Sequence, residues 1–558
     1  MMFEGRLERW VGGWRGPALA ALVALLAGLP GVFAVPPLDR DESRFAQATA
    51  QMLETGDFVV IRFQDQPRFK KPVGIHWLQA ASVSLVSKVE DREIWAYRLP
   101  SLLGAMLAAA ACAWGAAAFF GPRAGAAAGA LLGSTFLLST EAFIAKTDAV
   151  LCGATVLALA ALARIYAASR DGPPVGRLTR LMFWLGLSTS ILVKGPVGLM
   201  VVALTALTLS AWDRRWAWLK TLGWGWGVIL LLVVVGPWAW AVTVATDGGF
   251  WTTAFGSDFA PKLAGGQESH GAPFGYHTVL TPFLMFPGSL LLPAALALGW
   301  RARREPGVRF ALCWLVPSFF VFEITPTKLV HYTLPTYGAL AWLIVAALRE
   351  PVGRVPRWVG AGLSALAGLV FAGAIFYLLS EYGDPSDLTA AVLSGGLLAA
   401  AGLAGAYLLL RRAAALGLVA AGVLTVLGHA AFASLFAPRL EPLWLSHRIE
   451  EELARARLLP RQGIAPAPVA VAGYAEPSLV FALGTPTNLG GAPDAADAIL
   501  ERRPAVVEAR EDAAFQAAVK AAGLTPRQVG EIKGLDYSNG DEMDLRIYVA
   551  PGTTEDRP

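Results

Sequence analysis

The sequence predicts a polytopic all-α membrane protein with a polar loop after its first span and a small α/β domain at its C-terminal end. Three observations lead to this fold class. Hydrophobic residues make up 55% of the 558 residues, whereas charged residues make up only 16%. The mean hydropathy is +0.51. Apolar runs of about 18 or more residues recur along the chain, which is more apolar sequence than a single soluble core needs.

The first apolar run, 17–35, follows three arginines and at first sight resembles a signal peptide. It is long and lacks a convincing small-residue cleavage site, so we expect a retained first span. Further runs predict about thirteen transmembrane helices in total, within a membrane domain of residues 1–436. The expected spans are 17–35, 96–120, 124–142, 147–167, 180–194, 196–211, 222–245, 277–299, 308–325, 333–348, 358–379, 389–410 and 413–436.

The arginines indicate how these spans are oriented. If the N-terminus is cytoplasmic, every arginine-rich loop falls on the cytoplasmic side, as the positive-inside rule requires. These loops contain Arg123, 164–180, 214–215, 301–304, 349–357 and 411–412. The net charge of +4 mainly reflects these loops and does not indicate a nucleic-acid partner.

A small group of lysines does not follow the positive-inside rule, unlike the arginines. The same topology places on the outer face Lys70, Lys71, Lys146, Lys194 and Lys328. Cations that converge at one face against the topological preference favour a partner that carries phosphate. For any single lysine, snorkelling or a surface ion pair is the alternative.

The loop 36–95 concentrates charge that the rest of the chain avoids. Its apolar spacing predicts a helix over 43–54, capped by Asp41, and a second helix over 72–86, both lying in the membrane interface. The loop is therefore a candidate reaction centre at the depth of lipid headgroups. A capped helix with surface carboxylates and ion pairs within the loop is the alternative. The charged residues of this loop that are candidates for the reaction centre are Asp39, Asp41, Glu42, Arg44, Arg62, Lys70 and Lys71.

Other outer loops supply further polar groups. They contribute Asp148, Lys194, Lys328, His331 and Tyr332. Asp148 either caps a helix and pairs with a lysine, or lies near the acceptor. Four of the six histidines fall on or near this face, and they admit a divalent metal ion held by His270 with Asp41 or Glu42. No pair has the tight spacing of a metal motif, so hydrogen-bonded interfacial histidine is the alternative.

The tail, 437–558, has a different sequence pattern from the membrane domain. The odd number of spans leaves it on the outer side, like the polar loop. Short β-branched runs at 469–472, 505–507 and 545–549, with a helical stretch over 512–522, predict a small α/β domain. It contains no glycine-rich phosphate loop, and we expect it to contact the acceptor or to act as a structural cap.

Several motifs of the chain resemble a known family. The motifs are Asp-Glu-Ser-Arg-Phe-Ala at 41–46, Gly-Asp-Phe at 56–58, Lys-Lys-Pro at 70–72, Lys-Gly-Pro at 194–196, His-Gly-Ala-Pro-Phe at 270–274 and Thr-Lys-Leu-Val-His-Tyr at 327–332. The first three follow in the order and spacing of the first periplasmic loop of GT-C glycosyltransferases, and they resemble the branch that contains bacterial aminoarabinose transferases and protein O-mannosyltransferases. The other three match later motifs of that branch. The resemblance covers about residues 36–345 and is specific because the motifs occur in order.

The resemblance implies an integral-membrane inverting glycosyltransferase. Such an enzyme moves a sugar from a polyprenyl (undecaprenyl) phosphate to an envelope acceptor, lipid A or another glycolipid. It lies in the bacterial inner membrane, with its active site and C-terminus on the periplasmic side. Asp41 would be the general base, and Lys71 and Lys328 would bind the lipid phosphate. A positioned carboxylate assists loss of the acceptor proton by roughly 10²–10⁴-fold, and cations stabilise the departing phosphate.

The candidates fall into three groups by expected role. The catalytic candidates are Asp41 and Glu42. The donor-binding candidates are Arg44, Arg62, Lys70, Lys71, Lys194, Lys328, His331 and Tyr332. The candidates for sugar or acceptor contact are Asp148 and His270.

One position departs from the family pattern. Aminoarabinose transferases commonly have Glu-Lys-Pro where this chain has Lys70-Lys71-Pro72. The exchange of glutamate for lysine removes a metal or amine partner and adds positive charge. It therefore favours an acidic or neutral donor sugar over a cationic one.

Two other functions remain open at the level of the sequence. A protein O-glycosyltransferase of the same fold differs only in its acceptor. A lipid-linked sugar flippase or transporter should place charges near the membrane midplane, often on repeated halves. This chain gathers its charges at one face and shows no sequence repeat, which favours the enzyme over a transporter or a non-catalytic assembly factor.

Overall fold

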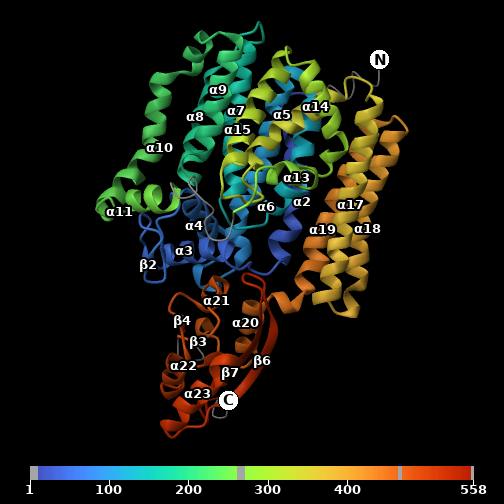
Figure 1. The fold of residues 1–558 in the computed structure, drawn as a ribbon. Coiled ribbons are helices and arrows are strands. Elements are labelled where there is room, and N and C mark those ends of the chain that lie inside the picture. Colours follow the sequence, from blue (N-terminus) through green and yellow to red (C-terminus); the bar gives the residue numbers. More distant parts are fainter. Residues whose placement is uncertain (1–10, 260–270, 463–467, 554–558) are drawn as a thin grey trace.

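The computed structural model describes residues 11–259, 271–462 and 468–553 (Figure 1). A bundle of membrane helices forms most of the described chain, and a smaller α/β domain lies at one end of the bundle. The first loop, with α3 (Asp41–Thr55) and α4 (Gly74–Val86), lies between these two parts in Figure 1. Both expected components of the fold are therefore present.

Nine helices in the described part of the chain are long and apolar enough to cross a membrane. A bent pair, Tyr276–Leu284 with Gly288–Arg301, makes a tenth if it counts as one span. The chain is thus a multi-pass membrane protein. The nine segments are α2 (Arg15–Ala34), α5 (Ile94–Gly133), α7 (Asp148–Ala168), α9 (Pro196–Asp213), α10 (Trp224–Ala245), α15 (Pro306–Ile324), α17 (Arg354–Tyr382), Pro385–Leu410 with α18 (Leu388–Leu410), and Ala414–Arg439 with α19 (Ala414–Ala431).

The expected number of about thirteen spans exceeds the nine or ten segments found among the described residues, for two physical reasons. First, α5 contains two antiparallel legs that meet at Gly121, where φ is +84°. The legs pack so closely that a Cβ on Gly129 would lie 2.4 Å from the carbonyl oxygen of Ala109. The expected spans 96–120 and 124–142 correspond to these legs, and α6 (Phe136–Glu141) follows the second.

Second, some expected spans are short or charged at their ends. The helix α8 (Arg177–Lys194) occupies the expected span 180–194 but contains three basic residues. The apolar helix at 334–347, which includes α16 (Tyr337–Ala347), is shorter than a full crossing. The short helices α13 (Tyr276–Leu284) and α14 (Leu292–Arg301) meet at a bend of 111°.

The first loop folds as two helices and a small hairpin. The helix α3 buries Phe45, Ala48 and Met52, as its spacing predicts, and α4 begins against α8, where a Cβ on Gly74 would lie 2.6 Å from the carbonyl oxygen of Leu192. Strands β1 (Arg62–Phe63) and β2 (Gln66–Pro67) join the helices. Polar residues of α3 such as Gln47 are also buried, because the C-terminal domain covers this helix.

The C-terminal domain is a five-stranded sheet with helices on both faces. Its strand order is β4-β3-β5-β7-β6, with β3 parallel to β4 and β5, and β7 antiparallel to β5 and β6. The sequence predicts β3, β5, β7 and one helix; β4 is short and β6 is largely exposed, which explains why neither has a clear apolar pattern. The elements are α20 (Leu445–Arg455), β3 (Ala470–Ala472), α21 (Pro477–Leu483), β4 (Asn488–Gly490), α22 (Ala492–Leu500), β5 (Ala505–Glu508), α23 (Ala509–Ala521), β6 (Arg527–Asp536) and β7 (Asp541–Val549).

Candidate active site

Two adjoining cavities lie where the first loop meets the membrane helices. One is a mainly apolar groove of about 200 Å³, and its walls include Met200, Phe250, Trp251 and Phe322. The other is a polar cavity of about 350 Å³, which extends towards the C-terminal domain. Six residues line both cavities and so mark their junction: Lys70, Lys71, Asp148, Lys194, His331 and Tyr332. Each of these six is a site residue predicted from the sequence.

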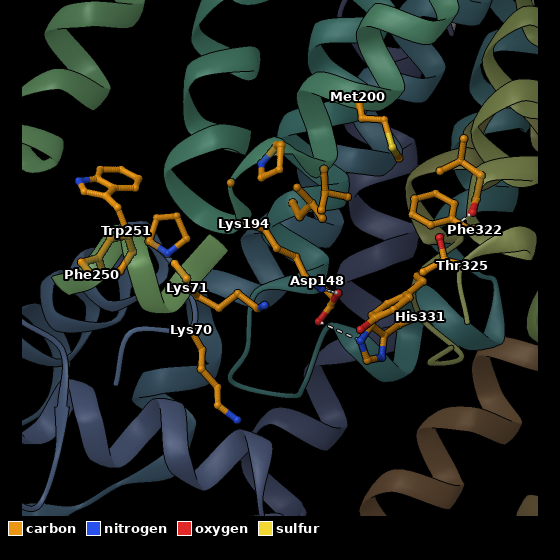
Figure 2. A pocket seen from close by; sticks show the side chains of 18 residues that line it. Lys70, Lys71, Asp148, Lys194, Met200, Phe250, Trp251, Phe322, Thr325 and His331 are labelled. Carbon is orange, nitrogen blue, oxygen red and sulfur yellow. Dashed lines mark hydrogen bonds and ion pairs between the residues drawn. The ribbon is translucent and has the colours of Figure 1, made fainter. Parts of the chain in front are cut away.

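Asp148 is the most highly connected group at the junction. It is the first residue of α7 and is 4% exposed. The Lys194 ammonium donates a hydrogen bond to its Oδ1 atom at 2.5 Å, and Nε2 of His331 lies 3.6 Å from its Oδ2 atom. Figure 2 shows Lys71 extending towards Asp148 from the opposite wall, whereas Lys70 points away. Lys194 also lies over the ring of Tyr332, 5.4 Å from its centroid.

A buried ammonium group, Lys146, connects Asp148 to a second carboxylate. Its Nζ atom lies 2.9 Å from Oε1 of Glu141 and 4.0 Å from Oδ2 of Asp148. Burial alone would lower the pKa of Lys146, but the two carboxylates raise it above its usual value, so the group stays charged. The sequence marks Lys146 only as an exception to the positive-inside rule, and Glu141 lies in an apparently apolar run.

The geometry assigns a tautomer to His331. Burial lowers the pKa of this imidazole well below its usual range, although Asp148 opposes the shift, so the ring is neutral. Nζ of Lys146 lies 3.2 Å from Nδ1 of His331. Because an ammonium can only donate, Nδ1 must accept and the ring proton resides on Nε2, which faces Asp148.

The first turn of α3 brings Asp41 to the polar cavity. Asp41 and Arg44 line the cavity wall, together with Arg68, which the sequence did not single out. Asp41 itself is exposed, in contrast to its neighbour in the chain. A carboxylate at a helix N-terminus interacts favourably with the helix dipole.

Glu42 occupies a different environment, although it is adjacent to Asp41. Its side chain is buried in an ion pair with Arg98, whose NH2 atom lies 2.7 Å from Oε2. Its Oε1 atom accepts the backbone N–H of Ala145 at 2.7 Å, and Arg98 also donates to the carbonyl oxygens of Val35 and Pro36. Glu42 lines neither cavity. It connects α2, α3, α5 and the segment that carries Lys146.

The structure places two other predicted site residues, Lys328 and Arg62, outside the two cavities. Lys328 is buried, and its ammonium donates to the carbonyl oxygens of Thr325 and Ala272 at 2.6 and 3.1 Å. Arg62 is exposed on β1. His270 lies outside the described residues, so a metal ion held by His270 with Asp41 or Glu42 stays a prediction.

A different group in the described chain has metal-ligand chemistry. Ligand atoms of Glu141, Asp148 and His331 lie within 4.8 Å of one another. The Lys146 ammonium already lies between them, however, and Lys194 neutralises Asp148. A divalent ion would have to displace Lys146. These residues therefore fit a buried lysine–carboxylate network better than a metal centre.

Comparison with known proteins points to one family. A family model described as dolichyl-phosphate-mannose-protein mannosyltransferase matches residues 70–240. The undecaprenyl phosphate-alpha-4-amino-4-deoxy-L-arabinose arabinosyl transferase of Aeromonas salmonicida is 29% identical over 61% of this chain and 62% of its own length. The transferase of the same name from Pseudomonas paraeruginosa is 30% identical over 67% of this chain and 69% of its own length.

A solved structure extends the similarity over the whole fold. The crystal structure of ArnT from Cupriavidus metallidurans in the apo state superposes with a TM-score of 0.75 at 20% identity, over 97% of this chain and 98% of that protein. The same protein bound to undecaprenyl phosphate gives a TM-score of 0.74 at 20% identity, over 96% and 98% of the two chains. The C-terminal domain is thus included in the shared fold.

Proposed function

The chain belongs to the family of undecaprenyl phosphate aminoarabinose arabinosyl transferases, and from this premise we propose that it transfers a sugar from a polyprenyl phosphate to an envelope glycolipid. It is a membrane glycosyltransferase of the GT-C fold. The observation that carries the proposal is the junction of an apolar groove with a polar cavity at shared lysines. A lipid-linked sugar has this same division into an apolar chain, a phosphate and a polar sugar.

The two cavities suggest how the donor would bind. The polyprenyl chain would lie in the apolar groove beside Met200 and Phe322, and the sugar would enter the polar cavity. The phosphate would lie at the junction, close to Lys71 and Lys194. Their ammonium groups would stabilise the charge that develops on the departing phosphate.

Asp41 is the proposed general base. It is exposed in the wall of the polar cavity, whereas Asp148 is occupied by Lys194. As the acceptor hydroxyl attacks the anomeric carbon, its proton passes to the Asp41 carboxylate and the carbon–oxygen bond to the phosphate breaks. A single displacement of this kind inverts the anomeric centre. Asp148 and His331 would orient the sugar or the acceptor from the opposite wall.

The charge of the polar cavity supports a class of sugar that differs from the amino sugar in the relatives' names, and the family supports an acceptor. The polar cavity is lined by more basic than acidic residues, including Arg44, Arg68 and Lys146. This surplus and the Lys70-Lys71-Pro72 sequence support an acidic or neutral sugar rather than a cationic one. Lipid A or a similar glycolipid is the proposed acceptor, and the similarity to bacterial undecaprenyl phosphate arabinosyl transferases supports it.

We place the protein in the bacterial inner membrane with a cytoplasmic N-terminus. The arginine-rich loops support this orientation, because they then all face the cytoplasm. The active site and the C-terminal domain would face the periplasm, where the envelope acceptor is located. The proposal assigns no metal ion to the described residues, because Lys146 and Lys194 supply the positive charge beside Asp148.

The experiment that tests the function compares envelope lipids by mass spectrometry. A deletion strain is complemented with the wild-type gene or with the Asp41→Asn variant. The expected result is loss of one sugar-sized mass from a glycolipid in the deletion strain and its return only with wild type. Unchanged glycolipids with a change in protein glycans would indicate a protein acceptor. Accumulation of untransferred lipid-linked sugar at the inner face would indicate a flippase and would contradict the proposal.

A further inference from the structure

The turn before α3 has an unfavourable backbone conformation. Arg40 has φ 58° and ψ −102°, although it is not glycine. Such conformations are unfavourable for residues other than glycine and persist only where the surroundings fix them. Since α3 begins at the next residue, this turn determines where the Asp41 carboxylate points in the polar cavity.

Contacts from the membrane domain fix one side of this turn. The backbone N–H of Leu38 donates to Oε2 of Glu42 at 2.9 Å, and the hydroxyl of Ser43 donates to the carbonyl oxygen of Leu38. Glu42 is itself held by Arg98. These contacts link the turn to α3 and, through Arg98, to α5.

Contacts from the C-terminal domain fix the other side. The backbone N–H of Asp39 donates to the phenol oxygen of Tyr537 at 2.7 Å, and the hydroxyl of Ser478 donates to Oδ1 of Asp39. Both partners are more than 430 residues away in the chain. Thus the residue directly before the strained position is hydrogen-bonded through its backbone and its side chain to another domain.

The two partners lie in different elements of the C-terminal domain. Ser478 is buried at the start of α21, which packs against α3, and Tyr537 lies in the turn between β6 and β7. The next residue of this turn, Ser538, reaches the wall of the polar cavity itself. Beside them, the hydroxyl of Thr485 donates to Oε2 of Glu54 at 2.6 Å. Figure 1 shows this domain against the α3 side of the bundle.

We propose that the C-terminal domain positions the catalytic base: Tyr537 and Ser478 hold the strained turn at Arg40 and thereby fix Asp41 in the polar cavity. The inference rests on the proposed role of Asp41. Tyr537 and Ser478 are positioning residues, because they contact the turn and not the reacting groups. The domain is then part of the catalytic machinery, and not only a cap or an acceptor contact.

The test uses the purified full-length protein and a polyprenyl-phosphate sugar donor, with the glycolipid acceptor identified by mass spectrometry. Tyr537→Phe removes one oxygen atom and Ser478→Ala another. We expect kcat to fall about tenfold in Tyr537→Phe and about 100-fold in the double variant, since small displacements of a reacting group have effects of this size. The KM for the donor should not change, because neither residue lines the apolar groove.

Tyr548→Phe is the matched control. It removes the same atom from a tyrosine of the same domain, but its hydroxyl donates to Asp512 within the domain, at 2.8 Å. Its kcat and KM should equal those of wild type. Thermal unfolding of each variant is measured in parallel, so that kcat refers to folded protein.

Two results would overturn the inference. One is a folded double variant with a kcat within twofold of wild type, while Asp41→Asn is inactive; the base is then correctly assigned, but the domain does not position it. The other is a changed KM for the acceptor with an unchanged kcat, which would make the turn an acceptor contact. Full activity of Asp41→Asn, or no transfer by wild type, would instead contradict the proposed function.

Discussion

The helix α7 has a charged cluster at each end, and the two clusters differ in composition and surroundings. At its first residue, Asp148 is paired with Lys194 and faces the neutral His331. At its other end, Tyr166 donates to Oδ2 of Asp213 at 2.6 Å, and two arginines, Arg170 and Arg309, form ion pairs with that carboxylate. With 21 residues and about 1.5 Å per residue, α7 separates the clusters by roughly 30 Å.

Their surroundings explain the different composition. The Asp213 cluster lines neither cavity, and arginines suit it because their planar groups form fixed, directional pairs. The Asp148 cluster opens to both cavities and uses lysines, which are point charges with rotatable donors. Among the described side chains, Oε2 of Glu141 beside it is buried without a hydrogen-bond partner. A buried charged cluster whose groups are incompletely satisfied next to a cavity is thus typical of chemistry, and a fully paired one of structure.

The largest expected effect concerns a fully paired cluster, Glu42 with Arg98, that lies beside the candidate active site. If full pairing indicates a structural role, Glu42→Gln should destabilise the fold, since loss of one partner of a buried ion pair costs about 3–5 kcal/mol. Arg98→Met should have the same effect, and the double variant should recover much of the loss. Thermal unfolding in detergent measures all three variants.

The result that would contradict this view is a Glu42→Gln variant that unfolds at the wild-type temperature but has lost turnover. Glu42 would then be a catalytic carboxylate, as the sequence predicts, and complete pairing would not distinguish structural from reactive groups.

The next prediction compares the two ends of α7 directly. Asp148→Asn should lower kcat about 100-fold, because it weakens the contacts through which Asp148 positions Lys194 and His331 at the junction of the cavities. Asp213→Asn should leave kcat of the folded protein unchanged and lower its unfolding temperature. Steady-state transfer rates, normalised to folded protein, separate the two outcomes. An equal loss of kcat in both variants would abolish the distinction between the ends.

Much of the fold and part of the site can be predicted from the sequence. Apolar runs locate the membrane helices, and lysines placed against the positive-inside rule locate the junction residues Lys71 and Lys194. Arg98 and Glu141 lie within apolar runs, so hydropathy alone hides them. Tyr537 has no local signal, because its importance comes from a contact across 498 positions of the chain. Tertiary contacts between distant segments are what one sequence cannot supply.

A smaller effect is expected for two lysines that the sequence groups together as phosphate ligands. Lys194→Met should raise the KM for the donor about tenfold, as expected for loss of one charge-assisted contact to phosphate. Lys328→Met should leave this KM unchanged, because the ammonium of Lys328 donates to backbone carbonyl groups. Donor titrations at saturating acceptor measure both values. An equal rise of the donor KM in Lys328→Met would indicate that Lys328 also binds the donor phosphate.

The smallest predicted effect is a pH dependence at the contact between the domains. Burial raises the pKa of the Asp39 carboxyl to about 7; a hydrogen bond from Ser478 opposes the shift, and nearby Glu476 and Asp536 add to it. The folded state therefore holds this proton more tightly than the unfolded state does, so the stability that it provides is present below about pH 4 and is lost as pH rises towards 7.

Asp39→Asn should remove this dependence, because the amide does not titrate. For wild type we expect the unfolding temperature to fall by on the order of 2 °C between pH 5 and pH 7, a small change because Asp39 is partly exposed to solvent. Hydrogen exchange at residues 38–40 over the same range should show faster opening at pH 7. An identical slope in wild type and Asp39→Asn would mean that another group titrates, and the strained turn would then be held equally well at both pH values. A slope confined to wild type would instead make Asp39 the point at which the C-terminal domain senses pH, one residue from the strained position that directs Asp41.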